Sequence, residues 1–214
     1  MPTVVELRKL ARDRNIKGRS KMNKAQLMKA LKITDKTKGR NFALKNTDFK
    51  PNLSPRQVIK LGSFGGTYWR PIKSEVTGKS YKNKHKVYPE SWWKDIPEAH
   101  MTRSWDNYDK NINKYKVKVG TTLEFWESKN WITTQNPYGW FQWYCDYYNG
   151  KRGSDDDRQI SRWKKTAGPN SRFRKRLINM IKKKGTTFDD ETVSPKIRQT
   201  LQHWGVKLTA ADLK

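Results

Sequence analysis

All ten tryptophans of the 214-residue chain lie between Trp69 and Trp204, and this distribution constrains the fold more than any other feature. Each large aromatic side chain buries much apolar surface, so the later part of the chain can form a substantial core. The high content of charged residues is typical of disorder, but nine tyrosines and seven phenylalanines favour a folded protein. The first part of the chain must fold with smaller apolar residues.

The most apolar segment, residues 137–148, predicts a central helix. Trp140, Trp143, Tyr144 and Tyr147 recur at the spacing of one helix face, and further aromatic residues extend the surface to a second side. A helix that is apolar on nearly all sides is usually buried. We therefore expect this helix to form the core of the later part of the chain.

Capping residues and helix breakers predict the other helices of this part. They are expected at residues 56–61, 89–94, 104–113, 154–167, 171–184 and 194–204. The paired glycines in Phe64-Gly65-Gly66-Thr67 indicate a tight turn, a short hairpin or the close approach of another backbone. The expected fold class is mainly α, with at most short hairpins.

Residues 1–33 predict a small unit of two helices. Thr3 with Glu6 fits a capping box for the first helix, and Asn23 can cap the second. Apolar residues recur at helical spacing in both helices: Leu7, Leu10 and Ala11, then Leu27 and Leu31. The segment holds ten Lys or Arg residues against two acidic ones, so it is densely basic.

Two stretches of this unit carry a family pattern. They read Val5-Glu6-Leu7-Arg8-Lys9-Leu10-Ala11 and Gly18-Arg19-Ser20-Lys21-Met22-Asn23-Lys24-Ala25-Gln26-Leu27. The pattern resembles a SAP-type module, a family close to the Rho N-terminal and helix-extended-helix modules. The resemblance implies a DNA-binding unit whose contacts come from the basic turn and the start of the second helix: Lys17, Arg19, Ser20, Lys21 and Lys24. The alternative is a basic helical hairpin that is inert or binds protein.

Residues 34–54 lack helical periodicity and are expected to form a linker. Within it, Phe42, Leu44 and Phe49 suggest that part of the linker docks on the later domain, residues 55–214. This later domain resembles an uncharacterised domain found in proteins of large DNA viruses, algae and fungi, which implies no activity. The matching residues are Phe64-Gly65-Gly66-Thr67-Tyr68, Pro137-Tyr138-Gly139-Trp140-Phe141-Gln142-Trp143-Tyr144, Asp157-Arg158-Gln159-Ile160, Arg162-Trp163, Arg198-Gln199-Thr200-Leu201 and His203-Trp204.

The formal net charge of +27 predicts a polyanionic partner. Nucleic acid is the expected one, DNA first and RNA as an alternative, because neutralising phosphates releases condensed counterions. We find no apolar run long enough to span a membrane and no signal peptide, so no membrane partner is expected. The chain is expected to be intracellular, in a nucleus, a virion or a viral factory, with protein partners in a virion or a chromatin-like assembly as a further expectation.

The predicted helix 171–184 has a basic stripe. Arg172, Lys175, Arg176, Asn179, Lys182 and Lys183 share one side, and Phe173, Leu177 and Ile181 share the opposite side. Arg174 points toward the apolar side and is expected to reach around the first turn. A helix with such faces suits a phosphate backbone, whereas the alternative is a solvated charged face.

Some tryptophans stand beside basic residues and are candidates for stacking on exposed bases. They are Trp69 beside Arg70, Trp92 and Trp93 beside Lys94, and Trp163 beside Lys164. A core position is the commoner role for any single tryptophan. Trp69 and Trp92, with Arg70, are the better candidates.

Catalysis and metal binding find little support. The single cysteine, Cys145, excludes an intramolecular disulfide, and with the scattered histidines it argues against a zinc finger. Residues Asp155-Asp156-Asp157 fit helix capping better than metal binding, and Glu124, Glu127, His100 and His203 match no recognised catalytic spacing. No cofactor is expected.

The sequence therefore predicts a nucleic-acid-binding protein with weak sequence specificity. A role in packaging or organising a genome, in a large DNA virus or a nucleus, is compatible with the excess of lysine over arginine. The alternative is a DNA- or RNA-processing enzyme, such as a nuclease or glycosylase, tethered by the SAP-like module. The chain is expected to be a binding protein rather than an enzyme.

Overall fold

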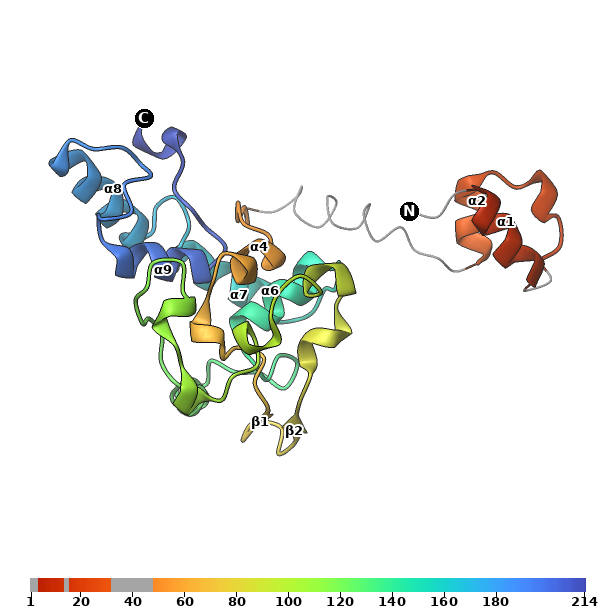
Figure 1. Ribbon diagram of the computed structural model, residues 1–214, viewed down its shortest axis with the longest axis horizontal. Helices are drawn as coiled ribbons and strands as arrows, with labels where there is room; N and C mark the ends of the chain where they lie inside the picture. The colour runs from red at the N-terminus through yellow and green to blue at the C-terminus, as the bar shows by residue number, and fades with distance from the viewer. Residues whose placement is uncertain (1–3, 14–15, 32–47) are drawn as a thin grey trace. The chain divides into compact units, whose positions relative to one another are not determined.

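The computed structural model describes residues 4–13, 16–31 and 48–214, and it is mainly helical, as the sequence predicts (Figure 1). The chain divides into two compact units, Met1–Ala43 and Leu44–Lys214, which are described here one at a time. In the described ranges, no helix combines the length and apolar character needed to cross a bilayer.

The first unit contains α1 (Val4–Asp13), the 3₁₀ helix η1 (Arg19–Lys21) and α2 (Lys24–Ala30). Its core is small: Leu7, Ala11, Leu27 and Leu31 are buried against one another. These residues come from the two predicted apolar stripes. With so few buried side chains, the unit has little apolar burial to stabilise it.

Asn23 caps α2 as the sequence predicts. Its side-chain oxygen accepts a hydrogen bond of 2.9 Å from the backbone N–H of Gln26, and Gln26 Oε1 accepts one of 2.9 Å from the N–H of Asn23. This reciprocal pair is a capping box, which satisfies two N–H groups that a helix start leaves open. The predicted cap at Thr3 lies outside the described residues.

The second unit is built from short helices around one aromatic core. In chain order its α-helices are α4 (Pro55–Lys60), α5 (Leu123–Ser128), α6 (Trp140–Tyr148), α7 (Asp156–Thr166), α8 (Arg172–Lys184) and α9 (Pro195–His203). Its 3₁₀ helices are η2 (Phe64–Gly66), η3 (Lys84–Val87), η4 (Glu90–Trp92), η5 (Glu98–His100), η6 (Trp105–Asn107), η7 (Lys110–Ile112) and η8 (Ala210–Leu213).

One small hairpin completes this unit. Strand β1 (Ile72–Lys73) pairs antiparallel with β2 (Ser80–Tyr81), with Ile72 opposite Tyr81. Figure 1 shows the hairpin and α8 at opposite ends of the second unit. The prediction of at most short hairpins is therefore confirmed for the described residues.

Helix α6 is the buried centre of the second unit, as its pattern predicts. Seven of its nine residues are buried, including Trp140, Trp143, Tyr144 and Tyr147. The ring of Phe49 packs edge-on against three of these rings at 5.3–5.5 Å, the partners being Trp143, Tyr144 and Tyr147. Such edge-to-face pairs add to the stabilisation from burial alone.

Residues 48–54 belong to the second unit rather than to the linker predicted for residues 34–54. Phe49 is fully buried in the aromatic core, and the carbonyl of Leu53 accepts a hydrogen bond of 2.6 Å from the Tyr144 hydroxyl. The docking predicted for Phe49 is confirmed. Residues 34–47, which include Phe42 and Leu44, lie outside the described part.

Two predicted helices are replaced by shorter structure. Residues 89–94 form only η4, and residues 104–113 form η6 and η7. In the second case the polar side chains bond locally: Asn107 Nδ2 donates to Ser104 Oγ at 2.8 Å, and Asp109 Oδ1 accepts from the N–H of Asn111 at 2.9 Å. Such bonds compete with α-helical hydrogen bonding, so the α-helix does not form.

Candidate nucleic-acid interface

Helix α8 begins and ends at the predicted residues. The Ser171 hydroxyl accepts a hydrogen bond of 3.2 Å from the backbone N–H of Arg174, and Gly185 ends the helix with a φ of 67°. Leu177 and Ile181, on the inner face of the helix, are fully buried. The helix is therefore fixed by one face, which leaves the other face to solvent.

The exposed face of α8 carries the predicted cations, which we call the α8 stripe: Arg172, Lys175, Arg176, Lys182 and Lys183. None of the five forms an ion pair with another residue in the described ranges. Part of the stripe borders a shallow depression lined by Arg172, Lys175, Arg176, Asn179, Met180 and Lys183. The stripe is thus a run of positive charge without local neutralisation.

Two other residues of α8 have different roles from the stripe. Arg174 turns away from it, and its Nε donates to Asp212 Oδ1 at 2.9 Å, so this arginine holds the C-terminal segment. Phe173 was expected on the apolar side but is 36% exposed. Helical spacing places Phe173 on the side of Leu177 and Ile181, but this side is only partly covered in the first turn.

The first unit presents its predicted contact residues in and after its turn. Lys17, Ser20 and Lys24 are exposed, and Arg19 is half-buried. The Arg19 guanidinium donates to the carbonyl of Ile16 at 3.4 Å. The side chain of Lys21 lies outside the described part. The exposed lysines therefore lie close together in sequence around η1.

Trp69 and Trp92 do not offer their faces to bases. Trp69 is 0% exposed and Trp92 is 3% exposed. The prediction that they stack on bases is wrong, because a ring enclosed on both faces cannot receive another. Trp69 packs against Tyr88 and Tyr138, and Trp92 stacks on Tyr88 with ring centroids 5.7 Å apart. Trp163, at 1% exposed, is core as well.

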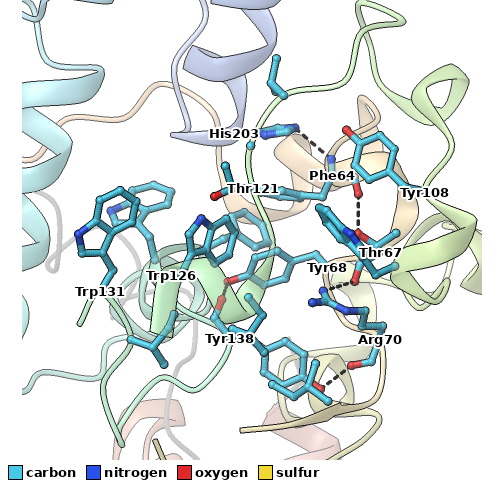
Figure 2. Close-up of a pocket in the computed structure, with 18 of the residues that line it drawn as sticks. Phe64, Thr67, Tyr68, Arg70, Tyr108, Thr121, Trp126, Trp131, Tyr138 and His203 are labelled. Carbon is cyan, nitrogen blue, oxygen red and sulfur yellow. Dashed lines mark hydrogen bonds between the residues drawn. The ribbon is translucent and has the colours of Figure 1, made fainter. Parts of the chain in front are cut away.

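The second unit also contains a cavity of about 240 Å³ lined by many aromatic side chains, which we call the aromatic pocket. Figure 2 shows Trp126 and Trp131 on one side of it and Tyr108 and Arg70 on the other. About half of its lining residues are Phe, Tyr or Trp, and none is Asp or Glu. The aromatic residues are Phe64, Tyr68, Trp105, Tyr108, Trp126, Trp131, Tyr138, Trp140, Phe141 and Trp204.

Two half-buried arginines line the aromatic pocket. Arg70 donates to the carbonyl of Thr67 at 3.1 Å and lies 5.4 Å from the Trp105 ring centroid. Arg162 donates to Gln159 Oε1 at 3.0 Å and lies 5.5 Å from the ring centroid of Trp131. A guanidinium has five N–H donors, so both arginines keep donors that no described side-chain carboxylate accepts.

Burial lowers the pKa of both guanidinium groups, but both stay charged. It lowers the pKa of Arg162 to about 10, with a further contribution from Arg158. It also lowers the pKa of Arg70. Arg162 is therefore protonated at neutral pH, and a bound anion would favour that charged state further.

Buried hydrogen bonds hold the pocket wall. The Tyr68 hydroxyl donates to the carbonyl of Tyr138 at 2.6 Å, and the Tyr138 hydroxyl donates to the carbonyl of Arg70 at 2.7 Å (Figure 2). Burial raises the pKa of Tyr138 to about 12, so its hydroxyl remains a donor. The backbone around Arg70 is thus anchored to the segment that precedes α6.

The turn at Phe64 also shapes the wall. Phe64 has a φ of 57°, in the left-handed region that a bulky residue rarely adopts. Its N–H donates to His203 Nε2 at 3.0 Å, and its ring stacks on the His203 ring with centroids 4.0 Å apart. Gly65 has no room for a side chain, since a Cβ there would lie 2.5 Å from the Tyr108 ring. The paired glycines therefore form a tight turn with close packing.

Several of the acidic and histidine residues considered for catalysis or metal binding have structural partners instead. Asp156 Oδ1 accepts from Trp143 Nε1 at 2.8 Å, and Asp155 pairs with Arg158. Glu127 accepts from Ser74 Oγ at 2.9 Å, and His203 is buried at the Phe64 turn. Within the described ranges, no three His, Cys, Asp or Glu residues gather as metal ligands would.

Sequence reasoning found Arg70 but missed most of the pocket. The accessible tryptophans are Trp105, Trp126, Trp131 and Trp204, none of which was singled out for base stacking. Arg162 was missed too, because its ring partners Trp131 and Trp204 come from distant parts of the chain. A basic neighbour in sequence is a poor signal, since it does not determine which way a tryptophan faces.

Comparison with known proteins adds no further assignment: no family model, no curated protein and no solved structure matches the chain.

Proposed function

We propose that the protein binds nucleic acid, DNA in the first instance, by neutralising backbone phosphates with little sequence specificity. The observation that carries the proposal is the α8 stripe, a row of cations on a fixed helix that lacks ion-pair partners among the described residues. Binding a polyanion releases condensed counterions, and this gain requires charges that the protein has not already paired. The formal net charge of +27 acts in the same direction over longer distances.

The first unit supplies a second contact surface in this proposal. It has two short helices joined by a basic turn, which supports this part of the proposal, and Lys17 and Lys24 are exposed there. Lysine is a mobile point charge that suits phosphate and does not read bases by a fixed fork. Two separate phosphate-binding surfaces on one chain raise the overall affinity through effective concentration.

The α8 stripe is tested with a double variant, Lys175→Gln with Arg176→Gln. If each cation meets one phosphate, the plot of log affinity for duplex DNA against log salt loses about 1.8 from its slope. The ratio of wild-type affinity to variant affinity then becomes about tenfold smaller as the salt concentration rises from 50 to 200 mM. Fluorescence anisotropy with a labelled duplex measures both quantities.

The matched control is Lys73→Gln with Lys79→Gln, two exposed lysines in or beside the β1–β2 hairpin at the other end of the unit. We expect this control to keep most of the wild-type slope. If the α8 variant kept the wild-type affinity and slope, or if wild-type binding did not depend on salt, the proposal would be wrong.

The first unit is tested separately by Lys17→Gln with Lys24→Gln in the full chain. Affinity for the same duplex falls severalfold at low salt, and the slope again decreases by up to about 1.8. Combined with the α8 variant, the two losses of slope should add, because the substitutions lie in separate compact units. An unchanged slope would remove the first unit from the interface.

A further inference from the structure

The phosphate-backbone binding proposed above does not use the aromatic pocket, whose composition favours one class of ligand. Its volume of about 240 Å³ exceeds that of cavities of about 150 Å³ that hold a benzene ring. Partly exposed tryptophans at its wall, such as Trp126 and Trp131, provide faces on which a planar ring can stack. The size and the lining therefore suit an aromatic ring system.

The charge of the pocket excludes two other ligand classes. Aromatic cages also bind quaternary ammonium groups, but Arg70 and Arg162 would repel a cation and the lining holds no carboxylate to attract one. A wholly apolar ligand would displace water from the free donors of both guanidinium groups without replacing its hydrogen bonds. The ligand must therefore combine an aromatic ring with negative charge.

The positions of the cations indicate where that charge lies. Arg70 stands over Trp105, whereas Arg162 stands over Trp131 and Trp204, so the two guanidinium groups belong to different parts of the wall. Lys118 does not line the pocket, but its Nζ lies 4.9 Å from the ring centroid of the lining residue Tyr108 and adds positive charge nearby. Cations at separate places around a ring-sized space suit a base that has phosphate groups on its flanks.

The backbone at the pocket supports a binding role as well. Phe64 is held in its left-handed conformation by the bond to His203 and by the packing of Tyr108 on Gly65. Strained backbone of this kind is concentrated at ligand sites, where the surrounding structure enforces it.

We propose that the aromatic pocket binds one unpaired nucleotide, with its base against the tryptophans and its phosphates at Arg70 and Arg162. The inference rests on the proposed function, since it gives the same nucleic acid a second mode of contact. Bases in a duplex are stacked and enclosed, so only a single-stranded or extruded nucleotide can enter. The protein then holds unpaired segments more tightly than its phosphate contacts alone allow.

The test compares pocket variants on two probes, a single-stranded oligonucleotide and a fully paired duplex of equal length. Trp131→Ala removes the most exposed tryptophan of the wall, and Arg70→Gln removes a guanidinium. Each variant should weaken single-strand binding about tenfold or more, in line with the loss of one stacked base. Duplex binding should stay within about twofold of wild type, and anisotropy measures both.

Two control variants match these changes outside the pocket. Val87 is 55% exposed and does not line the pocket, so Val87→Ala should leave both affinities unchanged. Arg152 stacks on Tyr147 outside the pocket, so Arg152→Gln controls for Arg70→Gln. Urea unfolding of each variant shows whether the fold is intact, and Trp131→Phe, which keeps a stacking ring, should retain most single-strand binding.

Free ligands identify the source of the nucleotide. Protein tryptophan fluorescence is titrated with a deoxynucleoside monophosphate and with the corresponding deoxynucleoside. Weak monophosphate binding beside tight oligonucleotide binding assigns the site to a strand, and monophosphate binding as tight as the oligonucleotide assigns it to free nucleotides. Equal binding of the nucleoside and the monophosphate would overturn the proposal, because the arginines would then contribute nothing.

The two proposals fail in different ways. If the α8 variant loses duplex binding while the pocket variants match wild type on both probes, the pocket proposal is wrong and the proposed function stands. If the pocket variants lose single-strand binding while the α8 variant changes nothing, the phosphate-backbone function is wrong and the pocket stands. Equal losses on both probes in the pocket variants would also refute the pocket as a site for unpaired nucleotides.

Discussion

Replacing Gly62 with alanine is expected to destabilise the second unit by more than about 4 kcal/mol, which is exceptional for one methyl group. Gly62 is buried and has a φ of 97°. A Cβ at this position would lie 1.9 Å from the backbone oxygen of Ile112. The clash involves main chain rather than the end of a flexible side chain, so local adjustment cannot relieve it.

The position of Gly62 makes the movement costly. Its carbonyl accepts hydrogen bonds from the N–H of Lys114 at 2.9 Å and from Gln202 Nε2 at 2.9 Å. Moving Gly62 away from Ile112 would therefore strain bonds to both the η7 region and α9. Buried acceptors that lose their partners add to the cost.

Gly150→Ala is the matched control for this prediction. Gly150 has a φ of 91°, and a Cβ there would meet nothing within 4 Å. The free energy of unfolding of Gly150→Ala should fall only by the cost of placing a side chain at a positive φ, about 1–2 kcal/mol. Urea unfolding followed by tryptophan fluorescence compares the two, and a Gly62→Ala variant that cannot be purified folded fits the expectation. Unfolding free energies within 1 kcal/mol of each other would contradict it.

Much of the local structure could be predicted because it depends on residues close in sequence. The spacing of Leu177 and Ile181, with Ser171 before them and Gly185 after them, defines α8 completely. The aromatic spacing in Pro137–Tyr148 likewise identifies α6 as the core helix. In both cases periodicity and capping act within one segment, so tertiary contacts did not need to be known.

The aromatic pocket could not be predicted for the opposite reason. Arg70, Tyr108, Trp131 and Arg162 come from four separate segments, and only packing brings them to one wall. Whether an individual tryptophan is buried also depends on packing between distant segments. Trp69 and Trp131 both lie outside helices, yet one is enclosed by Tyr88 and Tyr138 while the other is 41% exposed.

Acidification below about pH 6.5 is expected to weaken the second unit through His203. This residue is buried, and burial lowers its pKa to about 3, compared with about 6.5 in an unfolded chain. Between these values the unfolded state binds a proton that the folded state does not. The stability that the neutral imidazole provides is therefore complete above pH 6.5 and is lost as the pH falls toward 3.

The size of the effect follows from the proton count. One proton taken up only by the unfolded state lowers the free energy of unfolding by about 1.4 kcal/mol for each pH unit below 6.5. Burial also lowers the pKa of His85, so the wild-type slope contains a second contribution. Carboxylates with lowered pKa values, such as Asp212, add their own losses only in the more acidic range.

His203→Gln isolates this contribution, because an amide oxygen can accept the hydrogen bond from the Phe64 N–H but does not titrate. The variant is less stable than wild type at pH 7, where it loses the stacking on Phe64. Between pH 6.5 and 5 the unfolding free energy of the variant should fall less steeply than that of wild type, and the two slopes should differ by about 1.4 kcal/mol per pH unit. Urea unfolding at several pH values measures the slopes. Equal slopes for wild type and His203→Gln would show that the folded protein accepts a proton at His203, and the buried bond to Phe64 would then not hold the imidazole neutral.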